Sequence, residues 1–558
     1  MKDEPIGIII GTTNPYSLNF EVLRDEKKAV KRIYRGQFVK IPFKSVDGSI
    51  EFEIGRIVSV SRSNQLITED IAPQIATMMG EGNIELSDFG FRRDLSESVI
   101  AEVEILGHRI GNELVRPRAP LIPGELIFKA DTVFLKEQLR PQGEDFIKIG
   151  VLRDDLDVPV FINYEQLVSK HFAILAMTGG GKSYTCSVIL EEIVNEVGLP
   201  IVVFDPHGEY YGFLKANDRL EIQKSLKRLK TDELDPSLIL EIGEKVSKTV
   251  KVFSPDKEKL NKIKKKIMEK LELSQWVDVI DLKIQLGDLE TYQIISLLEV
   301  MSDLSAAQRR LLEAAWGPIH DQAMKGEFVS FDSIKSVIED NSDMVRGRSP
   351  VNLLIKKLEI FYKYRPFFAK SPAEKRISIS DLIKVDQVSV IDLSMIGLHD
   401  QQALGAILST QILKGRIDGE IPPTLVILEE AHRFAPSGHG INASLPTIRR
   451  IAQEGRKFFV GLGLISQRPS RIDSDVLSQC NTQIILRLTN PSDQNYVQKI
   501  SEWVSIEDIN EIRTLPPGEA FIFGPAVFLS LPAKIRPKAT FHGGVTPNLK
   551  EELELFRK

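Results

Sequence analysis

The stretch that decides the fold runs from Phe172 to Tyr184 and reads Phe-Ala-Ile-Leu-Ala-Met-Thr-Gly-Gly-Gly-Lys-Ser-Tyr. Its apolar start is typical of a buried strand, and the pattern that follows predicts a helix from Tyr184 to about Glu196. A glycine-rich turn between a strand and a helix, ending in Lys-Ser, is typical of a phosphate-binding loop, or P-loop. We therefore predict that a nucleotide binds at this turn.

Each residue type in this loop has a physical role. Backbone N–H groups of the turn converge on the β- and γ-phosphates at the positive end of the helix, and a Cβ atom would obstruct that approach. Lys182 adds a cation, and Ser183 offers its hydroxyl to Mg²⁺. Ala176 stands where the strict pattern has Gly, a small residue that P-loops tolerate. The predicted ATP-binding residues are Thr178, Gly179, Gly180, Gly181, Lys182, Ser183, Tyr184 and Asp205.

A second apolar run, Leu425 to Leu428, ends in the adjacent acids Glu429 and Glu430. A nucleotide hydrolase needs a carboxylate that holds the metal and its water shell, and a base that aligns the attacking water. We assign Glu429 to Mg²⁺, directly or through water, although the first acid of this motif is usually Asp. We assign Glu430 to activation of the water.

Other candidates follow further strands. The segment from Asp205 to Tyr210 ends a strand on the edge where α/β sheets bind ligands, so Asp205 or Glu209 either faces the nucleotide or belongs to a plain turn that caps the next helix. Gln467, at another strand end, is a candidate sensor of the γ-phosphate. An Arg at a subunit boundary could complete a neighbour's site as an arginine finger, or could simply be solvated. The candidates for that role include Arg449, Arg450 and Arg456.

Buried-type strands alternate with amphipathic helices after residue 163, which predicts an α/β fold: a RecA-like P-loop core with a parallel sheet. Short strands before that point predict an N-terminal small β-barrel, interrupted by one helix near residues 69–79. Between the predicted strand that ends at Asp205 and the one that begins at Val388 lie roughly 180 residues of mostly helical pattern. They are too many for a loop and predict an inserted helical subdomain. The predicted domains are 1–163 for the barrel, 164–214 with 386–537 for the core, 215–385 for the helical insertion and 538–558 for a C-terminal tail.

Composition narrows the class of protein. The chain has 558 residues, 42% of them hydrophobic and 27% charged, which is typical of a folded protein with more than one domain. Its net charge of -6 excludes a surface that is basic throughout, but not a few basic loops that grip nucleic acid. The basic run from Lys257 to Met268 fits either a solvated helix face or a DNA contact. Two distant cysteines indicate neither a disulfide framework nor a zinc site, and without an apolar stretch of membrane length we expect a cytoplasmic protein.

With these residues assembled, the chain resembles the HerA family of hexameric ATPases, relatives of the FtsK translocases. Motif order and rough spacing agree with the family from about Gly150 to Pro537, except in the helical insertion. The N-terminal barrel agrees only loosely. The matching segments are Gly150–Leu152, Asp157–Val160, Lys170–Leu175, the P-loop, Phe204–Tyr211, Glu429–His432, Ile451–Phe458 and Ser466–Pro469.

The resemblance implies a homohexameric ATPase with ATP and Mg²⁺ between subunits and double-stranded DNA in a central channel. It implies a DNA translocase or helicase of DNA end resection and repair, whose barrel docks a partner nuclease similar to NurA. By matched position, Glu430 is the catalytic acid, Gln467 the sensor and Arg456 the finger from the adjacent subunit. Lys170 falls where some relatives carry Arg, so the resemblance assigns it no role in trans.

Two other functions compete with this one. A nucleotide-gated ring could act chiefly as a scaffold that regulates an effector enzyme, as in antiviral operons that contain similar proteins. A conjugation- or secretion-type motor would require a membrane anchor or a substrate-docking domain, and the sequence shows neither.

Overall fold

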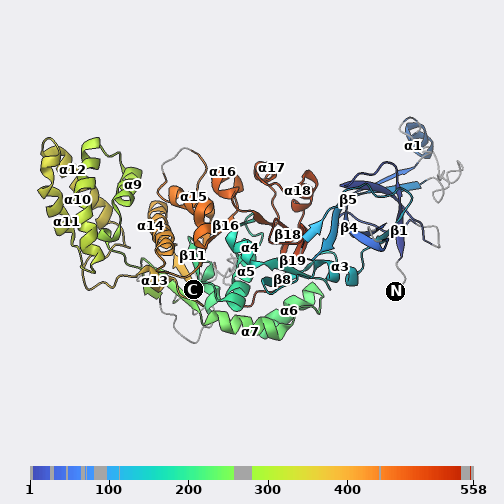
Figure 1. Ribbon diagram of the computed structural model, residues 1–558, viewed down its shortest axis with the longest axis horizontal. Helices are drawn as coiled ribbons and strands as arrows, with labels where there is room; N and C mark the ends of the chain where they lie inside the picture. The colour runs from blue at the N-terminus through green and yellow to red at the C-terminus, as the bar shows by residue number, and fades with distance from the viewer. Residues whose placement is uncertain are drawn as a thin grey trace. The chain divides into compact units, whose positions relative to one another are not determined.

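A computed structural model describes residues 4–25, 30–44, 48–64, 70, 72–80, 97–111, 113–256, 265, 279–438, 442–541 and 553 (Figure 1). The chain divides into two compact units. The N-terminal unit comprises residues 1–144 and 152–160, and the ATPase unit comprises residues 145–151 and 161–558. Among the described residues, no helix is long and apolar enough to cross a membrane.

The N-terminal unit is the predicted β-barrel. Among the described residues of this unit, seven strands follow the order β2-β1-β7-β3-β4-β5-β6, and an additional β2–β5 pairing closes the sheet on itself. Apolar side chains such as Phe20, Val39 and Val103 fill the interior because they alternate along strands with one buried face. The elements are β1 (Pro5–Ile10), β2 (Ser17–Val22), β3 (Phe38–Lys44), β4 (Ile50–Asn64), α1 (Ala72–Gly80), β5 (Glu97–Ile110), β6 (Glu113–Val115), β7 (Leu126–Lys129) and α3 (Thr132–Leu139).

In the part of the ATPase unit that the structure describes, twelve strands form one sheet in the order β13-β12-β14-β11-β15-β16-β10-β17-β18-β19-β8-β9. Pairing is parallel from β13 to β17 and antiparallel from β17 to β19. The strands are β8 (Phe146–Leu152), β9 (Pro159–Asn163), β10 (Phe172–Leu175), β11 (Ile201–Asp205), β12 (Val250–Ser254), β13 (Val279–Asp281), β14 (Val388–Asp392), β15 (Thr424–Glu429), β16 (Val460–Ser466), β17 (Thr482–Ile485), β18 (Glu519–Phe523) and β19 (Leu531–Ile535).

The P-loop strand β10 lies between β16 and β17, and every residue of β10, β11, β15 and β16 is buried. This explains their nearly unbroken apolar sequences, because helices cover both faces of a parallel sheet. The accompanying helices are α4 (Tyr164–Ser169), α5 (Lys182–Val197), α14 (Leu398–Ile417), α15 (Leu445–Glu454), α16 (Ser474–Leu477), α17 (Pro491–Ile500) and α18 (Ile506–Ile512).

The segment 215–385 is not entirely helical. Its strand β12 pairs in parallel with β14 and with β13, so it extends the ATPase sheet by two strands. Short strands of three and five residues carry little periodicity, which explains why the sequence pattern did not predict them. The helices are α6 (Arg219–Leu229), α7 (Pro236–Ser247), α9 (Thr291–Met301), α10 (Ala306–Met324), α11 (Phe331–Asp340), α12 (Arg348–Lys363) and α13 (Ile379–Leu382).

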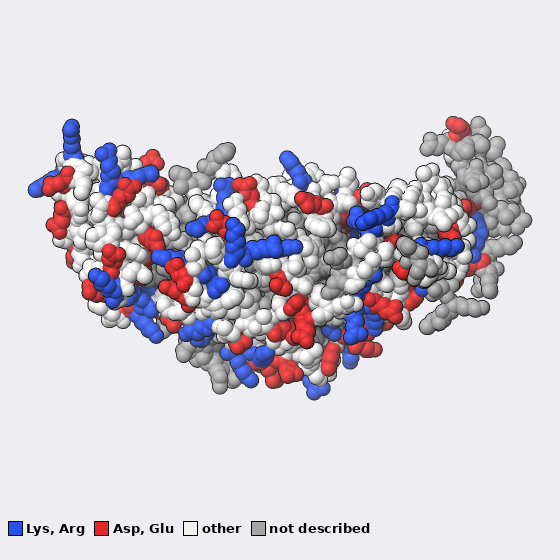
Figure 2. Space-filling view, in the orientation of Figure 1, with Lys and Arg blue, Asp and Glu red and all other residues white. Residues whose placement is uncertain are grey.

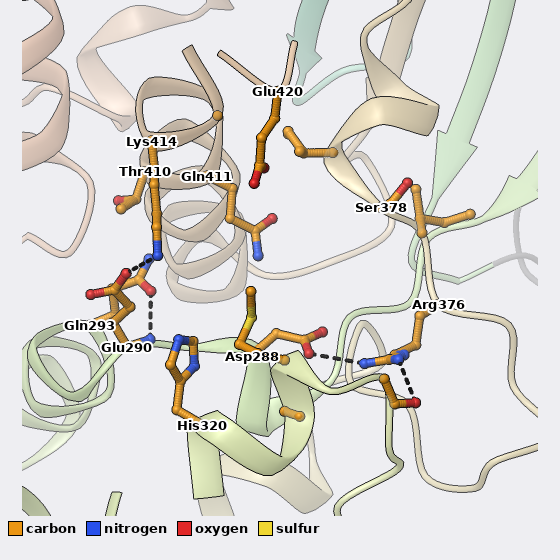
Figure 3. A pocket seen from close by; sticks show the side chains of 16 residues that line it. Asp288, Glu290, Gln293, His320, Arg376, Ser378, Thr410, Gln411, Lys414 and Glu420 are labelled. Atoms are coloured by element: carbon orange, nitrogen blue, oxygen red, sulfur yellow. Dashed lines mark hydrogen bonds and ion pairs between the residues drawn. The ribbon is translucent and has the colours of Figure 1, made fainter. Parts of the chain in front are cut away.

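Helices α9 to α12 gather into a lobe of their own (Figure 1). Trp316 is fully buried at its centre and donates from Nε1 to the Leu289 carbonyl at 2.7 Å. A cavity of about 400 Å³ separates this lobe from α14 (Figure 3). On its walls Arg376 pairs with Asp288 at 3.1 Å, and Lys414 of α14 pairs with Glu290. The second ion pair connects the lobe to the core.

Surface charge is mixed on the face shown in Figure 2, where Lys and Arg are interspersed with Asp and Glu. This agrees with the small net charge of the chain. The basic run 257–268, apart from Lys265, lies outside the described residues. Of the predicted tail 538–558, the structure describes residues 538–541 and Leu553.

Candidate nucleotide site

The P-loop leaves the sheet at the carboxyl end of β10. Backbone hydrogen bonds anchor its first residues, from the Ala176 amide to the Ser466 carbonyl at 3.2 Å and from the Met177 amide to the Arg487 carbonyl at 2.9 Å. Gly181 is the N-cap of α5, has a φ of 96°, and makes no side-chain capping bond. Because a glycine adopts this left-handed backbone readily, the loop can turn directly into the helix and direct the amide end of α5 at a ligand.

The two acids predicted from the sequence meet the P-loop in space. Lys182 Nζ lies 3.7 Å from Glu429 Oε1 and 3.7 Å from Glu430 Oε1. The Ser183 hydroxyl lies 3.5 Å from the same Glu429 oxygen. Strand β15 ends at Glu429, and Glu430 follows it with a φ of 50°, so adjacent residues present their carboxylates to one lysine.

Burial shifts the pKa of two groups at this site, Glu429 and His432. Burial raises the pKa of Glu429 to about 8, while the nearby Lys182 ammonium opposes that rise. Burial also lowers the pKa of His432, whose Nδ1 lies 3.3 Å from Glu430 Oε2. That Glu430 oxygen is buried and makes no hydrogen bond, so it can accept one from a water molecule.

Asp205 holds the turn after β11 through both of its carboxylate oxygens. Its Oδ1 accepts from the His207 and Gly208 amides at 3.1 and 2.8 Å, and its Oδ2 accepts from the Tyr210 amide at 3.0 Å. Asp205 therefore caps the turn, while Glu209 accepts a hydrogen bond from the Ser183 hydroxyl. Burial, with a contribution from Asp392, raises the pKa of Asp205 to about 6.

Tyr210 is a site residue that the sequence analysis missed. Its hydroxyl donates to Glu429 Oε2 at 2.8 Å, inside the protein. Its position beside Glu209 at a strand end was the only signal in the sequence. Tyr184, in contrast, turns away from the acids, since its hydroxyl accepts from the Lys538 amide at 2.7 Å.

The predicted sensor and the predicted finger lie at opposite ends of β16. Gln467 follows its carboxyl end and accepts a hydrogen bond from the Thr178 hydroxyl of the P-loop. Arg456 is exposed in the short 3-10 helix Gly455–Phe458, before the amino end of β16. Seven strand residues span on the order of 20 Å, so Arg456 does not join the site of its own chain. Arg449 is paired with Asp473 and Arg450 with Glu454.

The donor set fits a magnesium nucleotide. Ser183, Glu209 and Glu429 provide only oxygen ligands, which Mg²⁺ prefers, either directly or through its bound waters. Lys182 and the uncapped amide end of α5 provide positive charge for phosphates. A Cβ atom at Gly180 would lie 3.0 Å from the Met177 carbonyl oxygen, so a larger residue would distort the loop.

Sheet, P-loop and paired acids together define a P-loop ATPase. Residues 147–412 match the family model described as Helicase HerA, central domain. Beyond that segment, the chain is similar to HerA proteins over most of its length. It is 29% identical over 96% of its length to a DNA double-strand break repair helicase HerA of Pyrococcus furiosus, covering 92% of that protein. A protein with the same description from Sulfolobus acidocaldarius is 28% identical over 73% of this chain and 72% of its own. Among solved structures, VirB4 of Thermoanaerobacter pseudethanolicus superposes with a TM-score of 0.48 at 13% identity, covering 70% of this chain and 95% of that one.

Proposed function

We propose that this ATPase is a Mg²⁺-dependent translocase of double-stranded DNA. The observation that carries the proposal is the convergence of Lys182, Ser183, Glu429 and Glu430 on one point of the sheet edge. Relatives named as helicases of double-strand break repair support DNA as the substrate and a role in DNA end processing. A homohexamer around the duplex, working with a partner nuclease, completes the proposal.

Each residue has a distinct task in the proposed mechanism. The amide end of α5 and Lys182 hold the phosphates, and Ser183 and Glu429 hold Mg²⁺ or its waters. Bound Mg²⁺ would neutralise charge that develops on the phosphates during hydrolysis. Glu430 orients the attacking water and accepts its proton at Oε2, the buried oxygen that makes no hydrogen bond and lies 3.3 Å from His432 Nδ1. Gln467, tied to Thr178, reports the presence of the γ-phosphate to β16.

The position of Arg456 supports a ring in which each site is completed by a neighbour. At the far end of β16 this exposed guanidinium cannot reach its own P-loop, but a second copy could place it against the γ-phosphate. Lys182→Ala and Arg456→Ala subunits should each be inactive alone. Mixed together they should recover part of the ATPase activity, because some interfaces then contain an intact lysine facing an intact arginine. If the two variants are shown to assemble together and still have no ATPase activity, Arg456 does not act on the site of a neighbouring subunit.

The function itself is tested with linear duplex DNA. We expect ATP hydrolysis to rise when linear duplex is added, and the protein to displace a protein roadblock bound to that duplex. Lys182→Ala, which should not bind nucleotide, serves as the control variant. A rate of ATP hydrolysis that does not change when DNA is added would rule out the translocase function. DNA-stimulated hydrolysis without roadblock displacement would favour a nucleotide-gated scaffold.

A further inference from the structure

We propose that Tyr210 is a positioning residue that sets which oxygen of Glu429 faces the metal position. The Tyr210 hydroxyl donates to Glu429 Oε2 at 2.8 Å, and both side chains are buried, with exposures of 1% and 0%. The inference rests on the proposed magnesium site and adds to it a residue that never touches nucleotide.

The two oxygens of Glu429 have separate partners. Oε1 faces the P-loop, 3.5 Å from the Ser183 hydroxyl and 3.7 Å from Lys182 Nζ. Oε2 faces away from it and is taken by Tyr210. A glutamate has one more rotatable bond than the aspartate usual at this position, and its last torsion is broad. The tyrosine bond removes that freedom, so Oε1 alone is presented to Mg²⁺.

The backbone and the ring of Tyr210 are each held by other residues. Its amide donates to Asp205 Oδ2 at 3.0 Å, and its ring stacks on Phe213 with centroids 5.8 Å apart and planes 15° apart. The Lys538 ammonium lies 4.6 Å from the centroid of the Phe213 ring. The C-terminal segment, residues 536–541 after β19, therefore packs against Phe213. Since the phenol cannot follow a rotating carboxylate, it acts as a fixed point.

Packing alone does not explain a tyrosine here. A phenylalanine would fill the same space, but it would leave Glu429 Oε2 buried without a donor, which costs free energy. That carboxylate could regain a donor only by turning toward Lys182 and Ser183, which changes the metal site.

The test compares nucleotide binding with and without metal, with no turnover required. A fluorescent ATP analogue is titrated into wild type and Tyr210→Phe in metal-free buffer, and Mg²⁺ is then titrated into each complex. We expect metal-free affinity within about twofold of wild type, and a Mg²⁺ midpoint raised about tenfold, as for loss of one hydrogen bond to a charged group. Tyr362→Phe is the matched control, because its hydroxyl donates to the Ala369 carbonyl at 2.7 Å in the helical lobe.

A Mg²⁺ midpoint for Tyr210→Phe within twofold of wild type would overturn the inference, as would an equal shift in Tyr362→Phe. If wild type itself binds the analogue without any response to Mg²⁺, the proposed metal site fails and the inference with it. Should Tyr210→Phe not fold, Phe213→Leu decides instead. It removes the ring that orients Tyr210 and should raise the Mg²⁺ midpoint in the same direction; an unchanged midpoint contradicts the proposal.

Discussion

Glu191→Gln should strongly destabilise the ATPase unit. Glu191 lies on the P-loop helix α5, is fully buried, and binds the C-terminal segment through both oxygens. Oε1 accepts from the Thr540 amide and hydroxyl at 2.8 and 2.7 Å. Oε2 accepts from the Ala539 amide at 2.9 Å and from Arg536 Nη2 at 3.1 Å.

A glutamine offers one acceptor oxygen, so its NH₂ group must face two donors whichever way it turns. Two hydrogen bonds are then lost, and the buried Arg536 guanidinium loses one of its two carboxylates, the other being Glu192. Truncating one partner of a buried ion pair costs about 3–5 kcal/mol, and we expect a loss of unfolding free energy in that range. Urea unfolding followed by circular dichroism measures it. Glu196→Gln, on the exposed side of the same helix, should change stability by less than about 0.5 kcal/mol.

A loss below about 1 kcal/mol for Glu191→Gln, or an equal loss for Glu196→Gln, would refute the reasoning. The first result would mean that the C-terminal segment is not held on α5 by this carboxylate. The second would mean that the charge of the helix, and not the buried contacts, sets its stability.

Two further predictions concern stability. Burial raises the pKa of Glu429 from 4.5 to about 8, so the folded chain keeps a proton that the unfolded chain releases; the resulting stabilisation is complete below pH 4.5 and is lost as pH rises through 8. In metal-free buffer, the melting temperature of Glu429→Gln minus that of wild type should therefore increase as pH rises from 4.5 to 8. A thermal shift series in which this difference stays constant would contradict the raised pKa of Glu429. Trp316→Ala should lower the free energy of unfolding by about 3–5 kcal/mol, because it leaves a cavity in the helical lobe and leaves the Leu289 carbonyl without its donor. A urea midpoint unchanged from that of wild type would show that this lobe is not packed around the indole.

The features predictable from the sequence are those that neighbouring residues specify together. The P-loop is one contiguous run between a strand and a helix, and the acids end one apolar run, so a local pattern carries the chemistry of both. The α/β core and the N-terminal barrel were confirmed, since strand patterns recur along the chain with turn residues between them.

The missed features depend on contacts between distant residues. Tyr210 and Glu429 are 219 positions apart, and a tyrosine hydroxyl gives no local sign of its partner. Asp205 showed the ambiguity of an acid at a strand end, because capping a turn and facing a ligand call for the same residue type. Strand β12 is recognisable only through its pairing with β14, which lies beyond the whole helical lobe in sequence.

The most direct test of the central claim is a single-turnover measurement on Glu430→Gln. The variant keeps the P-loop and Glu429, so it should bind Mg²⁺ and ATP with an affinity within about threefold of wild type, while the rate of hydrolysis falls by at least about 100-fold because the attacking water loses its base. Hydrolysis within about tenfold of the wild-type rate would contradict the assignment of this buried carboxylate to catalysis.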